Sequence, residues 1–347
     1  MSIRNLARGR TLGRAPIVLF PIAVVVVVYA YALPSIARYD AVWSELRSLR
    51  SLWLTALAAA VLLNALTSAL PWRVLLPRLG LVSALRITQA STALITVLPG
   101  GAPAGMALSF AMLRSRQVGR EAAGLTVALT GIWSQLSTFV FPVVALAAIS
   151  AGGVLPRPVV WAAAGGIVVF AIVVVSFALA LAGRRLALAL GLATRTAVTP
   201  LLRLLRRPPP GWSRTSILRL HRTTRRVMRD RGLALTLATL ANQLSGFVVF
   251  DLSLRALGIT TGEISVAESF TAWSLARVIE SLPVTPGGLG LVELGLTGTL
   301  IAFGAAHAPV VAAVVLYRGL VVLPTLALGG IAGLTWKLRW SSEAMAG

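Results

Sequence analysis

Long apolar segments are the feature of this sequence that most constrains its fold. A helix that crosses the hydrocarbon core of a bilayer needs about 20 predominantly apolar residues. Charged residues make up only 12% of the chain, roughly half of what a soluble domain carries. The chain is therefore predicted to be an all-α polytopic membrane protein, with residues 1–347 forming a single membrane domain. Six segments reach the required length for a full span: 16–34, 52–72, 122–149, 158–183, 232–254 and 309–335.

Two further apolar regions are interrupted in the middle by proline and glycine. In region 84–113 each half is too short to cross, because a helix rises about 1.5 Å per residue against a core of about 30 Å. We therefore predict a re-entrant region, in which two half-helices meet at a bend. Region 266–305 has longer halves, so a second re-entrant region and two full spans both fit the sequence.

The distribution of arginine predicts the orientation of the spans. Thirteen arginines lie in the loop 184–231, where Asp230 is the single acidic residue. The positive-inside rule places this loop and both termini in the cytoplasm. Within the loop, segments 186–205 and 213–229 mix leucine with arginine, and we expect them to lie on the anionic lipid surface. Because the arginines lie between apolar spans, the net charge of +22 does not indicate nucleic-acid binding.

A weak internal repeat relates residues 52–150 to residues 232–335. With a shift of 178 residues, Asn64 falls on Asn242 and Thr67 falls on Ser245. After an insertion of nine residues, the Pro-Gly-Gly of the first broken region falls on the Pro-Gly-Gly of the second. The two halves are predicted to cross in opposite directions, so the repeats are inverted. Broken helices at matching places in inverted repeats are typical of transporter sites near the bilayer midplane.

The glycine-rich bends are candidate lipid-phosphate sites. At the second bend, Pro286 is predicted to end the incoming helix, and the next helix to begin near Leu289. The unpaired N–H groups at the start of that helix would then be directed at a phosphate. The glycines would let the backbone turn and approach a ligand closely. The candidate residues are Gly287, Gly288 and Gly290 at the second bend, and Pro99, Gly100, Gly101 and Gly105 at the first.

Four charged residues accompany the second bend: Arg277, Glu280, Glu293 and Arg318. A charged group at membrane depth costs about 2.5–3.5 kcal/mol on insertion scales, so these residues should be paired and face the interior. Two interpretations stay open. One is a structural ion-pair cluster that holds the helices together. The other is a lipid head-group site in which an arginine binds phosphate with two hydrogen bonds; both hold if an arginine exchanges partners.

The chain contains few residues of the types that bind metals or cofactors. There are no cysteines, and the two histidines, His221 and His307, are far apart in the sequence. We therefore predict neither a metal site nor a cofactor.

The motif around the second bend resembles the signature of the lysylphosphatidylglycerol synthase transmembrane-region family, the flippase-like part of the multiple peptide resistance proteins. The resemblance is carried by Arg277, Glu280, the run Leu282-Pro283-Val284-Thr285-Pro286-Gly287-Gly288-Leu289-Gly290, Glu293 and Tyr317-Arg318, and it extends over roughly 16–335. Pro99-Gly100-Gly101 with Gly105 is similar to an earlier broken segment of that family. The resemblance implies a lipid-translocating fold with two re-entrant regions.

The same resemblance does not imply lysyl transfer. In two-part members, that reaction belongs to a separate soluble domain after the membrane part. Here the sequence ends about a dozen residues after the last predicted span, so we expect a stand-alone member without the aminoacyltransferase domain, and not an enzyme.

The expected function is a flippase for a phosphate-containing phospholipid or polyprenyl-linked glycolipid in a bacterial cytoplasmic membrane. Arg277 or Arg318 would hold phosphate, and Glu280 or Glu293 would compete for the arginine. Two alternatives stay open. One is a polyprenyl-phosphate-dependent glycosyltransferase that uses Asp40 or Glu45 as its base. The other is a non-catalytic scaffold that binds partner proteins of envelope-lipid assembly.

Overall fold

The computed structural model describes residues 50–98, 100–150, 213–282 and 284–346, with isolated positions between 165 and 189. Several predicted features lie wholly or largely outside these residues. They are the spans 16–34 and 158–183, the segment 186–205, the N-terminus, and the single residues Asp40, Glu45 and Pro99.

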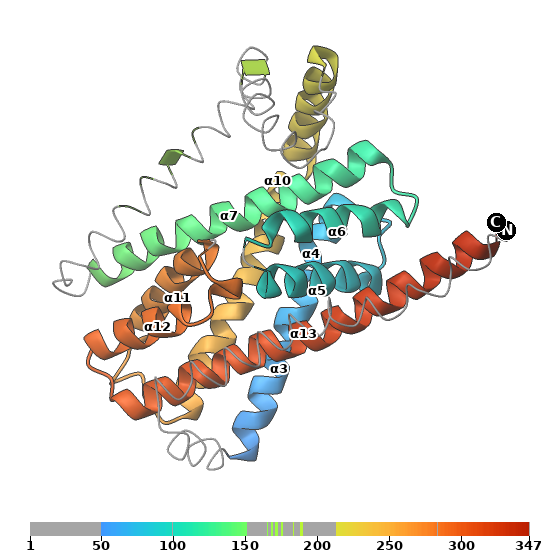
Figure 1. Cartoon of the computed structure of the whole chain (residues 1–347). Coiled ribbons are helices and arrows are strands. Elements are labelled where there is room, and N and C mark those ends of the chain that lie inside the picture. The colour runs from blue at the N-terminus through green and yellow to red at the C-terminus, as the bar shows by residue number, and fades with distance from the viewer. Residues whose placement is uncertain are drawn as a thin grey trace. The chain divides into compact units, whose positions relative to one another are not determined.

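The described residues form helices joined by short turns, and they contain no strand (Figure 1). The elements are α3 (Ser51–Ser68), α4 (Leu70–Leu75), α5 (Leu81–Val97), α6 (Ala102–Arg114), α7 (Arg120–Ser150), α10 (Arg214–Ala256), α11 (Val266–Ser281), the 3-10 turn η2 (Pro286–Gly288), α12 (Leu291–Ala302) and α13 (His307–Ala346).

Helices that are long and apolar enough to cross a membrane confirm the all-α membrane character of the described part. Four such stretches are found among the described residues: Ser51–Leu75, Arg120–Ala145, His221–Ala256 and His307–Trp336. Each overlaps one of the spans predicted from the sequence. The total number of spans in the chain stays a prediction.

In the first broken region two short helices meet at a bend, as predicted, and its re-entrant path in a membrane stays a prediction. Helix α5 has 17 residues and α6 has 13, so they reach only about 25 Å and 20 Å. They turn back on each other at Gly100, whose φ is 60°. A Cβ on Gly105 would lie 2.5 Å from the Ile95 side chain. Glycine is therefore required there for α6 to pack against α5.

The second broken region differs from the prediction at both sides of its bend. Helix α11 ends at Ser281, so Pro286 does not end the incoming helix, and that prediction is wrong. The reason is Leu282, which precedes a proline and is extended, with φ −79° and ψ 130°. Pro286 instead begins η2, and α12 begins at Leu291 rather than near Leu289.

The halves of this region are also short, so the expectation that they are longer than those of region 84–113 is wrong. Helix α11 has 16 residues and α12 has 12, which gives about 24 Å and 18 Å. The two helices pack on each other, and α12 also packs on α13 (Figure 1). Gly295 permits the close approach, since a Cβ there would lie 2.7 Å from Ile279 Cδ1.

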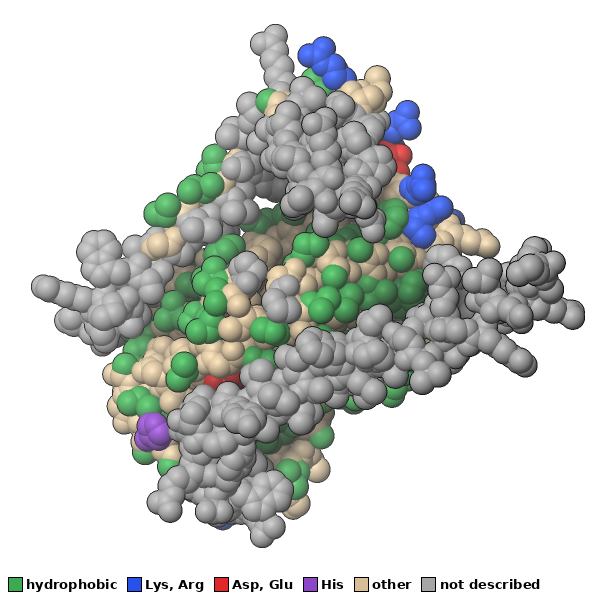
Figure 2. All heavy atoms as spheres, viewed as in Figure 1, with side chains coloured by type: hydrophobic (Ala, Val, Ile, Leu, Met, Phe, Trp, Pro, Cys, Tyr) green, Lys and Arg blue, Asp and Glu red, His purple; other side chains and the backbone are tan. Residues whose placement is uncertain are grey.

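Helix α10 joins two segments that the sequence analysis treated separately, the span 232–254 and the amphipathic segment 213–229. It is one helix of 43 residues. The sequence from 214 to 231 contains no proline, and Val227 and Met228 pack against a buried cluster of Leu75, Leu125, Leu129 and Leu235. This apolar packing continues the helix across the predicted boundary. Figure 2 shows basic side chains gathered near the start of α10 and apolar side chains on other described helices.

Arg231 anchors this part of α10. Its Nη1 donates to the carbonyl oxygens of Val74 and Leu75, each at 3.0 Å, at the end of α4. A cation at a helix C-terminus is favourable because the last carbonyls have no helical partner. We expect Arg231→Met to lower the free energy of unfolding by about 1–3 kcal/mol, measured by thermal unfolding in detergent. Arg229→Met is the matched control, because the Arg229 side chain is 85% exposed; equal losses in both variants would contradict the anchoring role.

The chain folds into two compact units. The first contains the described residues up to Leu62, Arg86–Ser109 and those from Gly246 onward, and therefore both bends. The second contains Leu63–Leu85 and the described part of Phe110–Ser245.

Polar side chains join α3 and α10 within the second unit. Asn64 Nδ2 donates to Ser245 Oγ at 3.0 Å and to the Asn242 carbonyl at 3.3 Å. The hydroxyl oxygens of Thr67 and Ser245 are 2.8 Å apart. The residues that the sequence shift of 178 pairs with each other therefore also meet in space.

Candidate functional site

The two bends lie in contact within the first unit. Val97 of the first bend and Leu289 of the second form one buried apolar cluster, with Leu98 and Leu326 packed against it. Gly287 lies against Thr96: a Cβ on Gly287 would be 2.7 Å from Thr96 Cγ2 and 2.9 Å from the Thr96 carbonyl oxygen. The structure thus brings together the two bends that the sequence analysis singled out as candidate lipid-phosphate sites.

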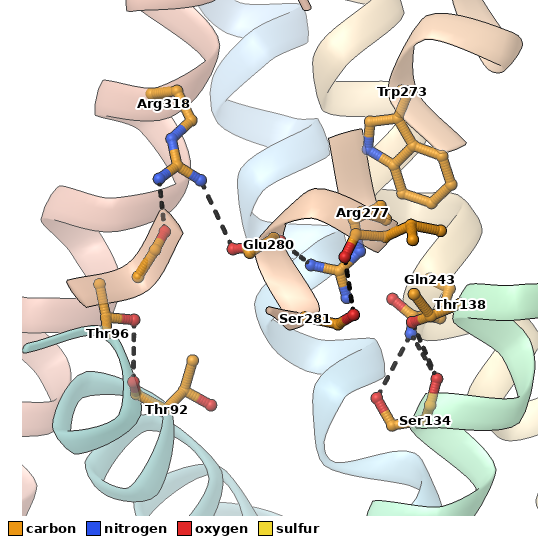
Figure 3. A network of polar contacts seen from close by, with 12 residues as sticks. Thr92, Thr96, Ser134, Thr138, Gln243, Trp273, Arg277, Glu280, Ser281 and Arg318 are labelled. Carbon is orange, nitrogen blue, oxygen red and sulfur yellow. Dashed lines mark hydrogen bonds and ion pairs between the residues drawn. The ribbon is translucent and has the colours of Figure 1, made fainter. Parts of the chain in front are cut away.

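The four predicted charged residues meet beside the second bend. Arg277 and Glu280 project from α11, Glu293 from α12 and Arg318 from α13. Figure 3 shows Arg277 and Arg318 pointing toward Glu280 from opposite sides. Glu280 Oε2 accepts from Arg277 Nη1, and Glu280 Oε1 lies 3.4 Å from Arg318 Nη1.

Arg318 ties three elements to its own helix. Its Nε donates to Glu293 Oε1 at 2.8 Å, and its Nη2 donates to the Gly287 carbonyl at 2.8 Å. With the contact to Glu280, it joins α13 to α11, to α12 and to the bend itself. The Arg318 side chain is 3% exposed, against 28% for Arg277. Arg318 is therefore built into the interior, and Arg277 is the more accessible of the two cations.

Glu293 occupies the start of α12. Its Oε2 accepts the N–H of Gly290 at 2.8 Å, which is the half of a capping box that a glycine at the N-cap permits. The sequence analysis expected the N–H groups here to be directed at a phosphate. In the structure one of them is already bound by a carboxylate of the chain, so a phosphate that used Gly290 would have to displace Glu293. The Gly101 N–H of the first bend likewise donates to the Leu98 carbonyl.

Thr285 adds a polar atom next to the second bend. It precedes η2, and its Oγ1 is buried with no hydrogen-bond partner among the described residues. A buried polar atom without a partner is uncommon and calls for an explanation. A ligand oxygen at the bend would supply the missing partner.

The aromatic ring of Trp273 lies beside Arg277, and the sequence analysis did not single out Trp273. The Arg277 guanidinium carbon lies 6.0 Å from the centre of the Trp273 ring, at the limit of a cation–π contact. Trp273 Nε1 donates to Tyr317 Oη at 3.2 Å, and Trp273 is 1% exposed. The available signal was spacing, because Trp273 and Arg277 are i and i+4 on one helix face.

A second ion pair lies apart from this cluster. Arg255 donates to Asp251 Oδ1 at 2.8 Å and to the carbonyls of Ile259 and Ile264. Ser269 also donates to Asp251. These contacts hold the connection from α10 to α11. No group of His, Cys, Asp and Glu that could hold a metal ion occurs among the residues that the structure describes.

Comparison with known families accounts for most of the chain. Residues 18–329 match the family model described as "Lysylphosphatidylglycerol synthase TM region". The matched range contains both bends and all four charged residues. No curated protein matches the sequence.

Proposed function

Since the chain belongs to the family of the lysylphosphatidylglycerol synthase TM region, we propose that it is a lipid flippase of the bacterial cytoplasmic membrane. Its substrate is a phosphate-containing phospholipid or polyprenyl-linked glycolipid. The observation that carries this proposal is the partly buried, charge-balanced cluster of two arginines and two glutamates, placed at a broken helix between apolar helices.

The position of Arg318 along α13 supports a site deep in the membrane. The candidate span runs from His307 to Trp336. At about 1.5 Å per residue, Arg318 lies about 16 Å from the His307 end, close to the middle of a hydrocarbon core of about 30 Å. Ionisable residues are rare at this depth, and those that occur commonly mark the path of a substrate or ion.

Helix lengths and symmetry-like contacts support re-entrant regions in inverted repeats. None of α5, α6, α11 and α12 exceeds 17 residues, fewer than a full span needs. Residues related by a two-fold axis contact each other where the axis passes between them. The Thr67–Ser245 contact joins positions 178 apart, the shift that superposes the repeats. Such an axis through α3 and α10 is the arrangement that inverted-repeat transporters use.

Arg277 is the proposed phosphate ligand. It is the more exposed cation, and its partner Glu280 also lies near Arg318. When a phosphate binds Arg277, Glu280 can turn toward Arg318, and when the phosphate leaves, the first pair re-forms. Arg318 and Glu293 meanwhile hold the bend. The acyl or prenyl chains stay in the bilayer throughout.

The basic face of α10 is the proposed contact with anionic lipid head groups. Arg219, Arg222, Arg226 and Arg229 are all exposed. Their spacing of three and four residues places them on one side of the helix, opposite the packed residues Val227 and Met228.

Reconstitution in vesicles tests the function. The purified protein is tested with labelled phosphatidylglycerol and labelled polyprenyl phosphate, and head-group movement between leaflets is followed for each. We expect one of the two lipid classes to be translocated faster than in protein-free vesicles. If folded protein moves neither, the flippase assignment fails, and a scaffold of envelope-lipid assembly becomes the better explanation.

A further inference from the structure

The charges around the second bend balance, and this balance constrains what can bind there. Arg277 and Arg318 carry two positive charges, and Glu280 and Glu293 carry two negative charges. Among the described residues, α12 presents Glu293 to this cluster, α13 presents Arg318 and Tyr317, and η2 presents no ionisable side chain. Asp251 and Arg255 of α10 pair with each other. The site is therefore neutral before a ligand arrives.

A phosphodiester head group would bring one negative charge into this neutral site. In a low-dielectric interior an uncompensated charge is costly, and ionisable groups there change protonation instead. The described residues near the cluster supply no further cation. A proton from the water on the side where the head group arrives can supply this positive charge, because a carboxylate of the cluster can take it up.

Glu280 is the carboxylate that loses most when phosphate binds. Its Oε2 is held by Arg277, the proposed phosphate ligand, and its other oxygen is 3.4 Å from Arg318. Glu293 instead keeps two contacts of 2.8 Å, to Arg318 and to the Gly290 N–H. Glu280 is also more exposed, at 29% against 10% for Glu293. Loss of the Arg277 hydrogen bond favours protonation of Glu280, and the exposure of its side chain gives water access to it.

We propose that each anionic head group bound at Arg277 is accompanied by one proton on Glu280, so that lipid and proton cross the membrane together. This inference rests on the proposed flippase function. An O–H bond forms at Glu280 when phosphate displaces it from Arg277. It breaks when the phosphate leaves on the opposite side and Glu280 pairs with Arg277 again. No bond in the lipid changes, and the step is electroneutral.

The consequence is that a pH gradient drives the lipid toward the more alkaline side. The test uses vesicles that contain the purified full chain, the labelled phosphatidylglycerol or polyprenyl phosphate that it translocates, and a pH-sensitive dye inside. For a monoanionic probe, a difference of one pH unit is expected to produce a leaflet ratio approaching about tenfold, because one proton is linked to one lipid. Acidification of the interior should depend on the presence of that lipid.

Variants assign the proton to a residue. With Glu280→Gln, any remaining transport should no longer follow the gradient, because the amide cannot take up a proton. Glu280→Asp keeps a carboxyl group and should keep the coupling. Glu121→Gln is the matched control, since Glu121 is exposed at the start of α7. The leaflet ratio of the lipid with this variant should equal that with the wild type.

The possible outcomes distinguish a failure of proton coupling from a failure of the flippase function. Lipid movement by the wild type that ignores the pH gradient would overturn proton coupling and leave the flippase standing. The absence of lipid movement in folded wild-type protein would overturn both. A Glu280→Gln variant that still follows the gradient would show that the proton binds elsewhere.

Discussion

Arg318→Ala is expected to lower the free energy of unfolding by about 3–5 kcal/mol, the range found when one partner of a buried ion pair is removed. The side chains of Arg318 and Glu293 are 3% and 10% exposed. The substitution removes a hydrogen bond to Glu293 and one to the Gly287 carbonyl, and leaves the Glu293 carboxylate without its cation. Thermal unfolding of the purified protein in detergent measures the loss.

A matched control and a double variant make this result interpretable. Arg222→Ala removes an exposed arginine of α10 and should change stability by less than about 0.5 kcal/mol. Adding Glu293→Gln to Arg318→Ala should restore part of the loss, because it removes the unpaired carboxylate. If Arg318→Ala is no less stable than Arg222→Ala, Arg318 does not hold the helices together.

Gly287→Ala is expected to abolish transport by forcing the two bends apart. The backbone of Gly287 has a φ of 57°, which costs a residue with a side chain about 1–2 kcal/mol. The new methyl group would also overlap the Thr96 carbonyl oxygen, which cannot rotate away as a side-chain tip can. Lipid translocation in vesicles and thermal unfolding measure the two effects separately.

The control for this variant is another glycine of the same region. A Cβ on Gly298 in α12 would meet nothing within 4 Å, and alanine in a helix is favoured over glycine by up to about 1 kcal/mol. Gly298→Ala should therefore transport normally and be at least as stable as the wild type. Full activity in Gly287→Ala would mean that the close contact between the bends is not needed.

Features set by local sequence could be predicted without the structure. The apolar spans near 52–72, 122–149 and 309–335 correspond to observed helices because their length alone requires a membrane. The break at Gly100 and Gly101 was predicted because glycine next to proline ends regular helix. The meeting of Arg277, Glu280, Glu293 and Arg318 followed from the cost of leaving charges unpaired at membrane depth.

Features set by tertiary contacts could not be predicted in the same way. The contact of Glu293 with the Gly290 N–H was missed because the start of α12 was expected near Leu289 and not at Leu291. The continuity of α10 depends on packing of Val227 and Met228 against leucines far away in the sequence. The different roles of Arg277 and Arg318 follow from their burial, which a linear pattern does not contain.

The most direct test of the proposed function is the rate of lipid translocation by Arg277→Ala, measured against Arg78→Ala in matched vesicle preparations, because Arg78 is exposed in the turn between α4 and α5. Both variants remove one arginine side chain, but only Arg277 lies beside the bend. We expect Arg78→Ala to retain the wild-type rate and Arg277→Ala to lose at least about 90% of it, since charged hydrogen bonds to a phosphate contribute about 1.5–3 kcal/mol. Equal rates for the two variants, in protein with the same thermal stability, would contradict a phosphate site at Arg277.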